Sequence, residues 1–211
     1  MSLILGGLLL AAGPAAAQLP ESQGGALAMT GSQKRTLLLI AREAVEASRA
    51  GRPSREPTNL DRRLTLAQPL IISIYLDGRL WTRAWQLKNA SPLYLAARGL
   101  TYEALAHPKI GGRPLTPEEL GRVQIGLDVL SGYAQAKDET EVPPRSAVII
   151  YSGFTEWLAL PGDVKSDQAA DLLTYACQQA GLRPNAWLLP QETTIFSAQV
   201  DTAREGFGGG K

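Results

Sequence analysis

The apolar residues of this chain follow a helical period in three segments. From Gln33 to Gly51 they recur three or four positions apart, which places them on one face of a helix. A second such segment follows Ser91-Pro92, where serine suits the N-cap and proline the first helical position. The third runs from Asp167 to Ala180 and is followed by a glycine and a proline. The pattern therefore predicts three main helices.

The segments between these helices carry strand patterns. Leu70 to Leu76 is apolar on both faces, which predicts a buried strand. Asp77-Gly78 offers the two positive-φ residues of a type I′ turn, so the chain should return antiparallel. Further strands are expected at 123–129, 147–151, 154–160 and 193–200, with a short helix after Thr116 and a loop at 131–145. Helices mixed with hairpins favour a single α+β domain with a mixed, largely antiparallel sheet.

The strand that returns from this turn combines tryptophan with arginine. A period of two places one set of side chains on one face: Arg79, Trp81, Arg83 and Trp85. The alternate residues, with Leu80 and Ala84 among them, can pack inward, or the Trp/Arg row can face inward instead if it covers a cavity. An arginine stacked on an indole can be structural cover, but the same row can also hold a ligand. The pattern leaves both interpretations open.

The N-terminus resembles a secretory signal peptide. Residues 2–17 carry no charge, Leu3 to Leu10 is mostly apolar, and Ala15-Ala16-Ala17-Gln18 fits a cleavage site, although a basic n-region is missing. We therefore expect cleavage after Ala17, export to the periplasm or the medium, and no transmembrane segment in the mature protein. A flexible lead-in at 18–32, a domain at 33–203 and a flexible tail at 204–211 complete the expected organisation.

Composition narrows the function classes. The 211 residues are 45% hydrophobic and 19% charged, which suits one globular domain. A net charge of +1 lacks the broad positive field of nonspecific nucleic-acid binding, so we expect no nucleic-acid partner. The segment from Lys34 to Arg63 contains eight basic and four acidic residues. This excess of positive charge fits a solvated surface or a docking patch for an acidic partner.

Few residues qualify for catalysis or metal binding. His107, the only histidine, lies near the expected end of the second helix and lacks neighbours for a zinc site, so we expect no metal. Cys177, the only cysteine, belongs to the apolar stripe of the third helix. Asp128 lies on the polar face of its strand, as a surface acid or as a partner for an arginine. No cofactor motif is present in the sequence.

Several blocks in order resemble the AMMECR domain, the protein-A member of the AmmeMemoRadiSam set, over about Thr36 to Val200. They are LLLIAREAVEA, IISIYLDGRL, RPLTPEELGRVQIGLDVL, VPPRSAVIIYSGFTEWLALP and LLTYACQQAGLRPNAW. The resemblance implies an α+β fold and an unsettled biochemical activity. It also brings Memo-type and radical-SAM proteins into consideration as partners.

This chain departs from the family pattern after the Asp-Gly turn. The family reads LRGCIG there, whereas this chain has Leu80-Trp81-Thr82-Arg83-Ala84-Trp85. An arginine cannot replace a thiolate nucleophile, and indoles fill space that glycine leaves open. The later DPRF segment has become HPKIGGRP, which keeps only Arg113. The chemistry that the usual motif supports is therefore expected to be lost or altered.

Three hypotheses follow, and no catalytic residue is assigned. The first is a non-enzymatic binding or accessory module that holds a small anionic ligand or a peptide. Its candidate binding residues are Trp81, Arg83, Trp85, Arg113, His107 and Asp128. The second is an enzyme of altered mechanism, in which Arg83 stabilises charge and His107 or Asp128 transfers a proton. The third is a structural relic in which the tryptophans only pack.

Overall fold

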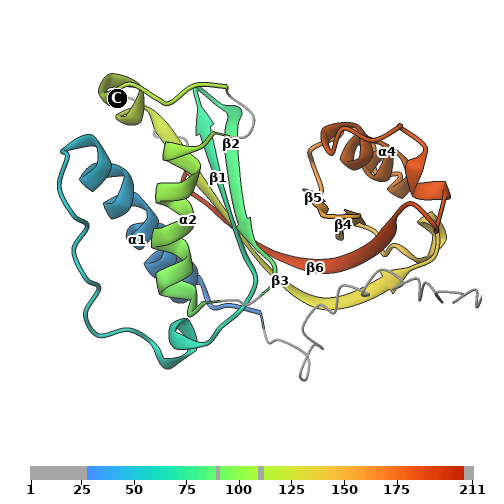
Figure 1. Cartoon of the computed structure of the whole chain (residues 1–211). Coiled ribbons are helices and arrows are strands. Elements are labelled where there is room, and N and C mark those ends of the chain that lie inside the picture. The colour runs from blue at the N-terminus through green and yellow to red at the C-terminus, as the bar shows by residue number, and fades with distance from the viewer. Residues whose placement is uncertain (1–27, 89–90, 109–111, 207–211) are drawn as a thin grey trace, which may run out of the picture.

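The fold is built on one six-stranded sheet in the order β2-β1-β3-β6-β4-β5 (Figure 1). The computed structural model describes residues 28–88, 91–108 and 112–206. The strands are β1 (Leu70–Leu76), β2 (Arg79–Gln86), β3 (Val123–Ala136), β4 (Ala147–Ser152), β5 (Thr155–Ala159) and β6 (Thr194–Arg204). The helices are α1 (Gly31–Arg49), α2 (Leu93–Ala106), α3 (Pro117–Leu120) and α4 (Ala169–Gln179), with short 3-10 turns η1 (Arg62–Thr65), η2 (Glu139–Glu141) and η3 (Ala186–Leu188).

The predicted α+β class with three main helices is confirmed. Among the described strands every pair is antiparallel, so the sheet is antiparallel and the expected mixed character is not found there. The hairpin turn is also confirmed, because Asp77 and Gly78 have φ values of 51° and 79°.

Two long strands join the halves of the curled sheet. β3 and β6 pair along most of their length and run from the β1–β2 half to the β4–β5 half (Figure 1). The loop expected at 131–145 is therefore wrong for its first part, where β3 continues to Ala136. Pairing with β6 satisfies the polar backbone of this segment, and a bulge at Gly132, with φ 60°, interrupts the register. β6 likewise extends beyond the expected Val200 to Arg204.

Three apolar clusters stabilise the sheet. Leu70, Ile72 and Ile74 of β1 pack with α1 and α2 on one face. α4 packs with residues of β4, β5 and η3 in a second cluster. Ile71, on the opposite face of β1, joins Ile149 and other residues of β4 and β5 in the third. The face of β1 and β2 that turns away from α1 and α2 is thus buried as well.

Some helix boundaries differ from the sequence expectation. α1 begins at Gly31, with Thr30 in a capping box, and Met29 is buried, so ordered structure starts before Gln33. Ser91 does not cap α2: Pro92 is the N-cap residue, and Ser91 accepts a hydrogen bond from Gln86 instead. Proline has no side-chain oxygen that could accept a bond from the first-turn N–H groups, so α2 has no side-chain cap.

The basic segment near α1 is partly neutralised within the chain. Its ion pairs include Lys34–Asp201, Arg42–Glu205 and Arg52–Glu43. These pairs reduce the positive charge left for an acidic partner. In the described part of the chain, no helix is long and apolar enough to cross a bilayer. The expected signal peptide lies outside the described residues.

Candidate functional site

Arg83, the arginine at the altered family motif, forms a buried ion pair. Its side chain is 4% exposed, and its Nη1 and Nη2 donate to Asp163 Oδ2 and Oδ1 at 2.7 and 2.8 Å. Its Nε donates to Ser73 Oγ on β1 at 3.1 Å. The guanidinium therefore binds two side chains of its own chain in a fixed, bidentate geometry.

The ion pair joins the two halves of the sheet. Arg83 lies on β2, whereas Asp163 lies in the loop after β5. Asp163 Oδ2 also accepts from Leu160 N–H at 2.8 Å, and Asp163 N–H returns a bond to Leu160. Burial alone would lower the pKa of Arg83, but the hydrogen bonds and charge of Asp163 outweigh it and raise that pKa. The Arg83 guanidinium therefore stays charged over the physiological pH range.

Trp85 makes a second link between the same halves. Its Nε1 donates to Glu156 Oε1 on β5 at 3.0 Å. Its ring meets Trp157 edge-on, with centroids 5.3 Å apart. This tryptophan therefore packs between strands at the two edges of the sheet.

The expected Trp/Arg row is broken by a bulge. Ile74 pairs with Thr82, but Tyr75 pairs with Leu80, so Trp81 is the extra residue of β2. Residues paired across antiparallel strands share a face, which places Leu80 on the Arg83 face and moves Arg79 to the opposite one. The prediction that all four residues form one row is wrong because the register shifts at this point.

Trp81 and Arg113 do come together. The Arg113 guanidinium lies 5.1 Å from the Trp81 ring centroid and makes a bidentate pair with Glu119 of α3. Arg113 lowers the pKa of Glu119 to about 2. Trp81 Nε1 is buried and has no hydrogen-bond partner among the described residues. Arg113 thus covers the Trp81 indole, and its own position is fixed by Glu119.

Asp128 is buried on the Arg83 face of β3. Its Oδ1 accepts from Thr202 Oγ1 on β6 at 2.6 Å, and it is 3% exposed. Burial raises the pKa of Asp128, and the Thr202 bond and the charge of Arg83 oppose this effect only in part. Asp128 is therefore not a surface acid, and it bonds a threonine rather than pairing directly with an arginine.

His107 is the exposed C-cap residue of α2, and its backbone N–H donates to the Glu103 carbonyl oxygen. Cys177 lies on the buried face of α4. Burial raises the pKa of its thiol, which disfavours the thiolate. Within the described residues no group of three His, Cys, Asp or Glu side chains could hold a metal ion.

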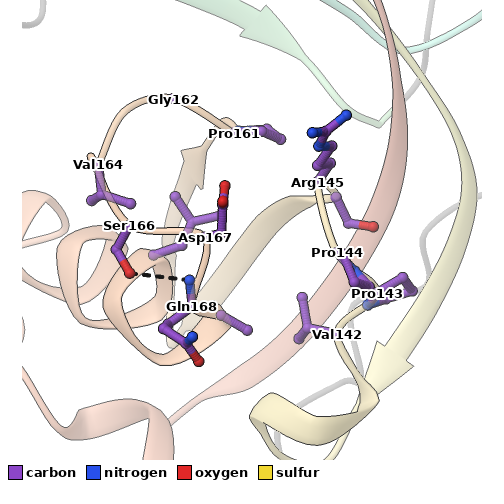
Figure 2. A pocket seen from close by; sticks show the side chains of 13 residues that line it. Val142, Pro143, Pro144, Arg145, Pro161, Gly162, Val164, Ser166, Asp167 and Gln168 are labelled. Atoms are coloured by element: carbon purple, nitrogen blue, oxygen red, sulfur yellow. Dashed lines mark hydrogen bonds between the residues drawn. The ribbon is translucent and has the colours of Figure 1, made fainter.

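A cavity of about 390 Å³ lies beside the Arg83–Asp163 pair. One wall is the 142–146 turn and the other is the segment 161–169 that leads into α4 (Figure 2). Pro161, Gly162 and Val164, the neighbours of Asp163, line it, whereas Asp163 turns to Arg83. Arg83, on the edge strand β2, therefore fixes the segment that forms one wall of the cavity, which follows β5 at the other edge of the sheet.

The other wall contains a strained arginine. Ser146 N–H donates to Pro143 C=O at 3.2 Å, which closes a turn with Pro144 and Arg145 at its centre. Arg145 has a φ of 61°, the position that glycine favours in such a turn. A side chain there costs on the order of 1 kcal/mol or more in backbone strain. The exposed Arg145 therefore lines the cavity from a backbone conformation that glycine prefers.

Polar groups surround the same space. Ser146 lines the cavity, is 6% exposed, and its hydroxyl has no hydrogen-bond partner among the described residues. On the opposite wall Ser166 Oγ accepts from Gln168 N–H at 3.1 Å, and α4 begins there without a side-chain cap. Asp167 is exposed on this wall. None of the six sequence-predicted site residues lines this cavity.

Sequence reasoning missed these cavity residues. A usable signal was present, because Pro143-Pro144 and Pro161-Gly162 mark two turns that flank one hairpin. The two outer ends of an antiparallel hairpin lie at the same end of its strands. Once the hairpin was assigned, the segments around Arg145 and Asp167 could therefore have been predicted to lie near each other.

Comparisons with known proteins establish the fold and no activity. No protein-family model matches the chain. Protein Mbar_A1807 of Methanosarcina barkeri is 24% identical over an alignment of 103 residues that covers 45% of this chain and 51% of that protein. The match thus spans about half the length of this curated relative. The crystal structure of the uncharacterized protein PH0010 from Pyrococcus horikoshii has a TM-score of 0.73 and 16% identity, and the superposition covers 87% of this chain and 96% of that chain. At this identity the likeness concerns the fold alone.

Proposed function

We infer that this protein is an exported, AMMECR-like binding module that holds a small ligand in the cavity between the 142–146 turn and the 161–169 segment. The observation that carries this proposal is the cavity itself. Its volume of about 390 Å³ lies in the range of small-molecule sites, and polar groups stand among apolar walls. The AMMECR assignment and export are supported by the sequence blocks and the N-terminal pattern.

Rigid walls favour binding. Asp163 is fixed by Arg83 and by Leu160, so the segment around it is ordered before any ligand arrives. A preformed site loses less conformational entropy on binding than a flexible one. In this proposal Arg83 positions the ligand site instead of touching the ligand.

The same contacts weigh against the enzyme hypothesis. Catalysis by Arg83 with His107 or Asp128 requires Arg83 and one of these two proton-transfer groups to reach the same reacting centre. The Arg83 guanidinium is occupied by Asp163 and Ser73, and Asp128 is bound by Thr202. His107 is exposed at the end of α2. We therefore propose that the protein binds a ligand without catalysis. The resemblance implies a Memo-type or radical-SAM protein as its partner.

A ligand screen with cavity variants tests the proposal. Purified protein is screened by thermal shift against a metabolite library, and hits are followed by titration. Val164→Trp should abolish binding by filling the cavity, whereas Lys165→Trp, exposed on the same loop but outside the lining, should leave it intact. If the hits bind both variants equally, or if no compound binds at all, the cavity is not a ligand site.

A separate measurement tests export. Mass spectrometry of secreted or periplasmic protein should give a mature N-terminus at Gln18. An intact N-terminus on protein recovered only from the cytoplasm contradicts this part of the proposal.

A further inference from the structure

We propose that the ligand of this cavity carries both a carboxylate and an ammonium group, as a free α-amino acid does. Arg145 binds the carboxylate and Asp167 binds the ammonium. The inference rests on the proposed binding function and adds the chemical class of the ligand.

The two charges stand on opposite walls. Figure 2 shows Arg145 on the side of the 142–146 turn and Asp167 on the side that leads into α4. Neither forms an ion pair with the other or with another described residue. Many arginines of this chain do pair with an acid, as Arg83, Arg113 and Arg183 illustrate. Arg145 and Asp167 therefore remain available to a ligand of complementary charge.

The backbone at Arg145 supports a role for its side chain. Its φ of 61° suits glycine, and glycine would close the same turn without strain. Strained conformations of this kind concentrate at binding sites, where the side chain is needed in that position. A purely structural turn has no use for arginine here.

The remaining lining sets the size and polarity of the ligand. Next to Arg145, Ser146 adds a hydroxyl that bonds to none of the described residues, and it can donate to a carboxylate oxygen. Val142, Val164 and Leu172 offer an apolar surface for a small side chain. None of the residues that line the cavity is aromatic, so a nucleobase has no surface on which to stack. The carboxylate of Asp167 disfavours a phosphate, which leaves a small zwitterion as the matching class.

Titration calorimetry with matched probes tests the charge requirement. L-leucine carries both groups, N-acetyl-L-leucine lacks the ammonium, and L-leucinamide lacks the carboxylate. Loss of one charge-assisted contact should weaken binding about 10-fold or more, so both derivatives should bind more weakly than L-leucine. The same three forms of L-valine and L-alanine are also titrated, in case the apolar part of the cavity is too small for a leucine side chain. Equal binding of an N-acetyl amino acid and its parent overturns the inference.

Two variants assign the roles of the charged residues. Arg145→Gly should retain or raise the Tm and should weaken binding of the amino acid about 10-fold or more. Asp167→Asn should weaken this binding to a similar extent. Lys165→Gln and Asp171→Asn, which lie outside the lining, are the matched controls and should bind as the wild type does. If the controls weaken binding as much as the cavity variants, or Arg145→Gly has no effect, the inference fails.

The outcomes separate this inference from the proposed function. If no amino acid binds but library compounds bind in a Val164→Trp-sensitive manner, the zwitterion class is wrong and the binding function stands. If neither amino acids nor library compounds bind, both are wrong.

Discussion

The buried Arg83–Asp163 pair should be the most costly polar contact to break in this protein. The two side chains are 4% and 9% exposed, and Asp163 accepts three hydrogen bonds at 2.7–2.8 Å, two of them from Arg83. Arg83→Met leaves Asp163 with only the Leu160 N–H. Removal of one partner of such a pair typically costs about 3–5 kcal/mol, because the other charge remains buried and unpaired. We therefore expect a loss of that order.

Urea unfolding of a double-mutant cycle measures this effect. Arg83→Met and Asp163→Asn are each expected to destabilise by about 3–5 kcal/mol, and the double variant by clearly less than the sum. For a domain of this size about 1 kcal/mol shifts the Tm by roughly 2–4 °C. Arg183→Ala is the control, because Arg183 and Glu192 are 63% and 43% exposed and their pair should contribute at most about 1 kcal/mol.

Two results would refute this reasoning. One is a cost below about 1 kcal/mol for both single variants, since the buried pair would then behave as a surface pair. The other is strict additivity in the double variant, which means that the two side chains do not interact. Arg83→Lys should fall between the wild type and Arg83→Met, because lysine keeps the charge but loses the bidentate geometry.

Three further outcomes are expected. The pKa of Asp128 is raised in the folded state, so its contribution to stability falls as pH rises from the unfolded-state pKa through the folded-state pKa. Asp128→Asn should therefore gain stability relative to the wild type between pH 4 and pH 7 in thermal melts. A stability difference that stays constant with pH would contradict this. Gly126→Ala places a Cβ 3.0 Å from the Tyr75 ring and should destabilise by about 1–3 kcal/mol in urea unfolding, whereas an unchanged midpoint would mean that the ring moves freely. Trp81→Phe removes a buried, unpartnered N–H and should cost less than about 1 kcal/mol despite the lost volume, and a cost above 3 kcal/mol would point to an additional partner for the indole.

Local patterns in the sequence were sufficient for most of the elements. The apolar stripe of α1, the Asp77-Gly78 turn and the capping box at Thr116 depend on neighbours within a few residues. They were predicted correctly because helix periodicity and turn chemistry act over that range. The ends of β3 and β6 were missed, since Ser131 to Ala136 becomes a strand only through its pairing with β6.

The sequence alone drew attention to Arg83, and only the tertiary structure decided what Arg83 contacts. Asp163 lies 80 residues away, and the two meet because the curled sheet brings the loop after β5 onto the face of β2 that turns away from α1 and α2. The same curvature, together with the hairpin β4–β5, sets Arg145 opposite Asp167 across the cavity. Residue type and local period are properties of short segments, whereas these placements depend on the strand order and the curvature of the whole sheet.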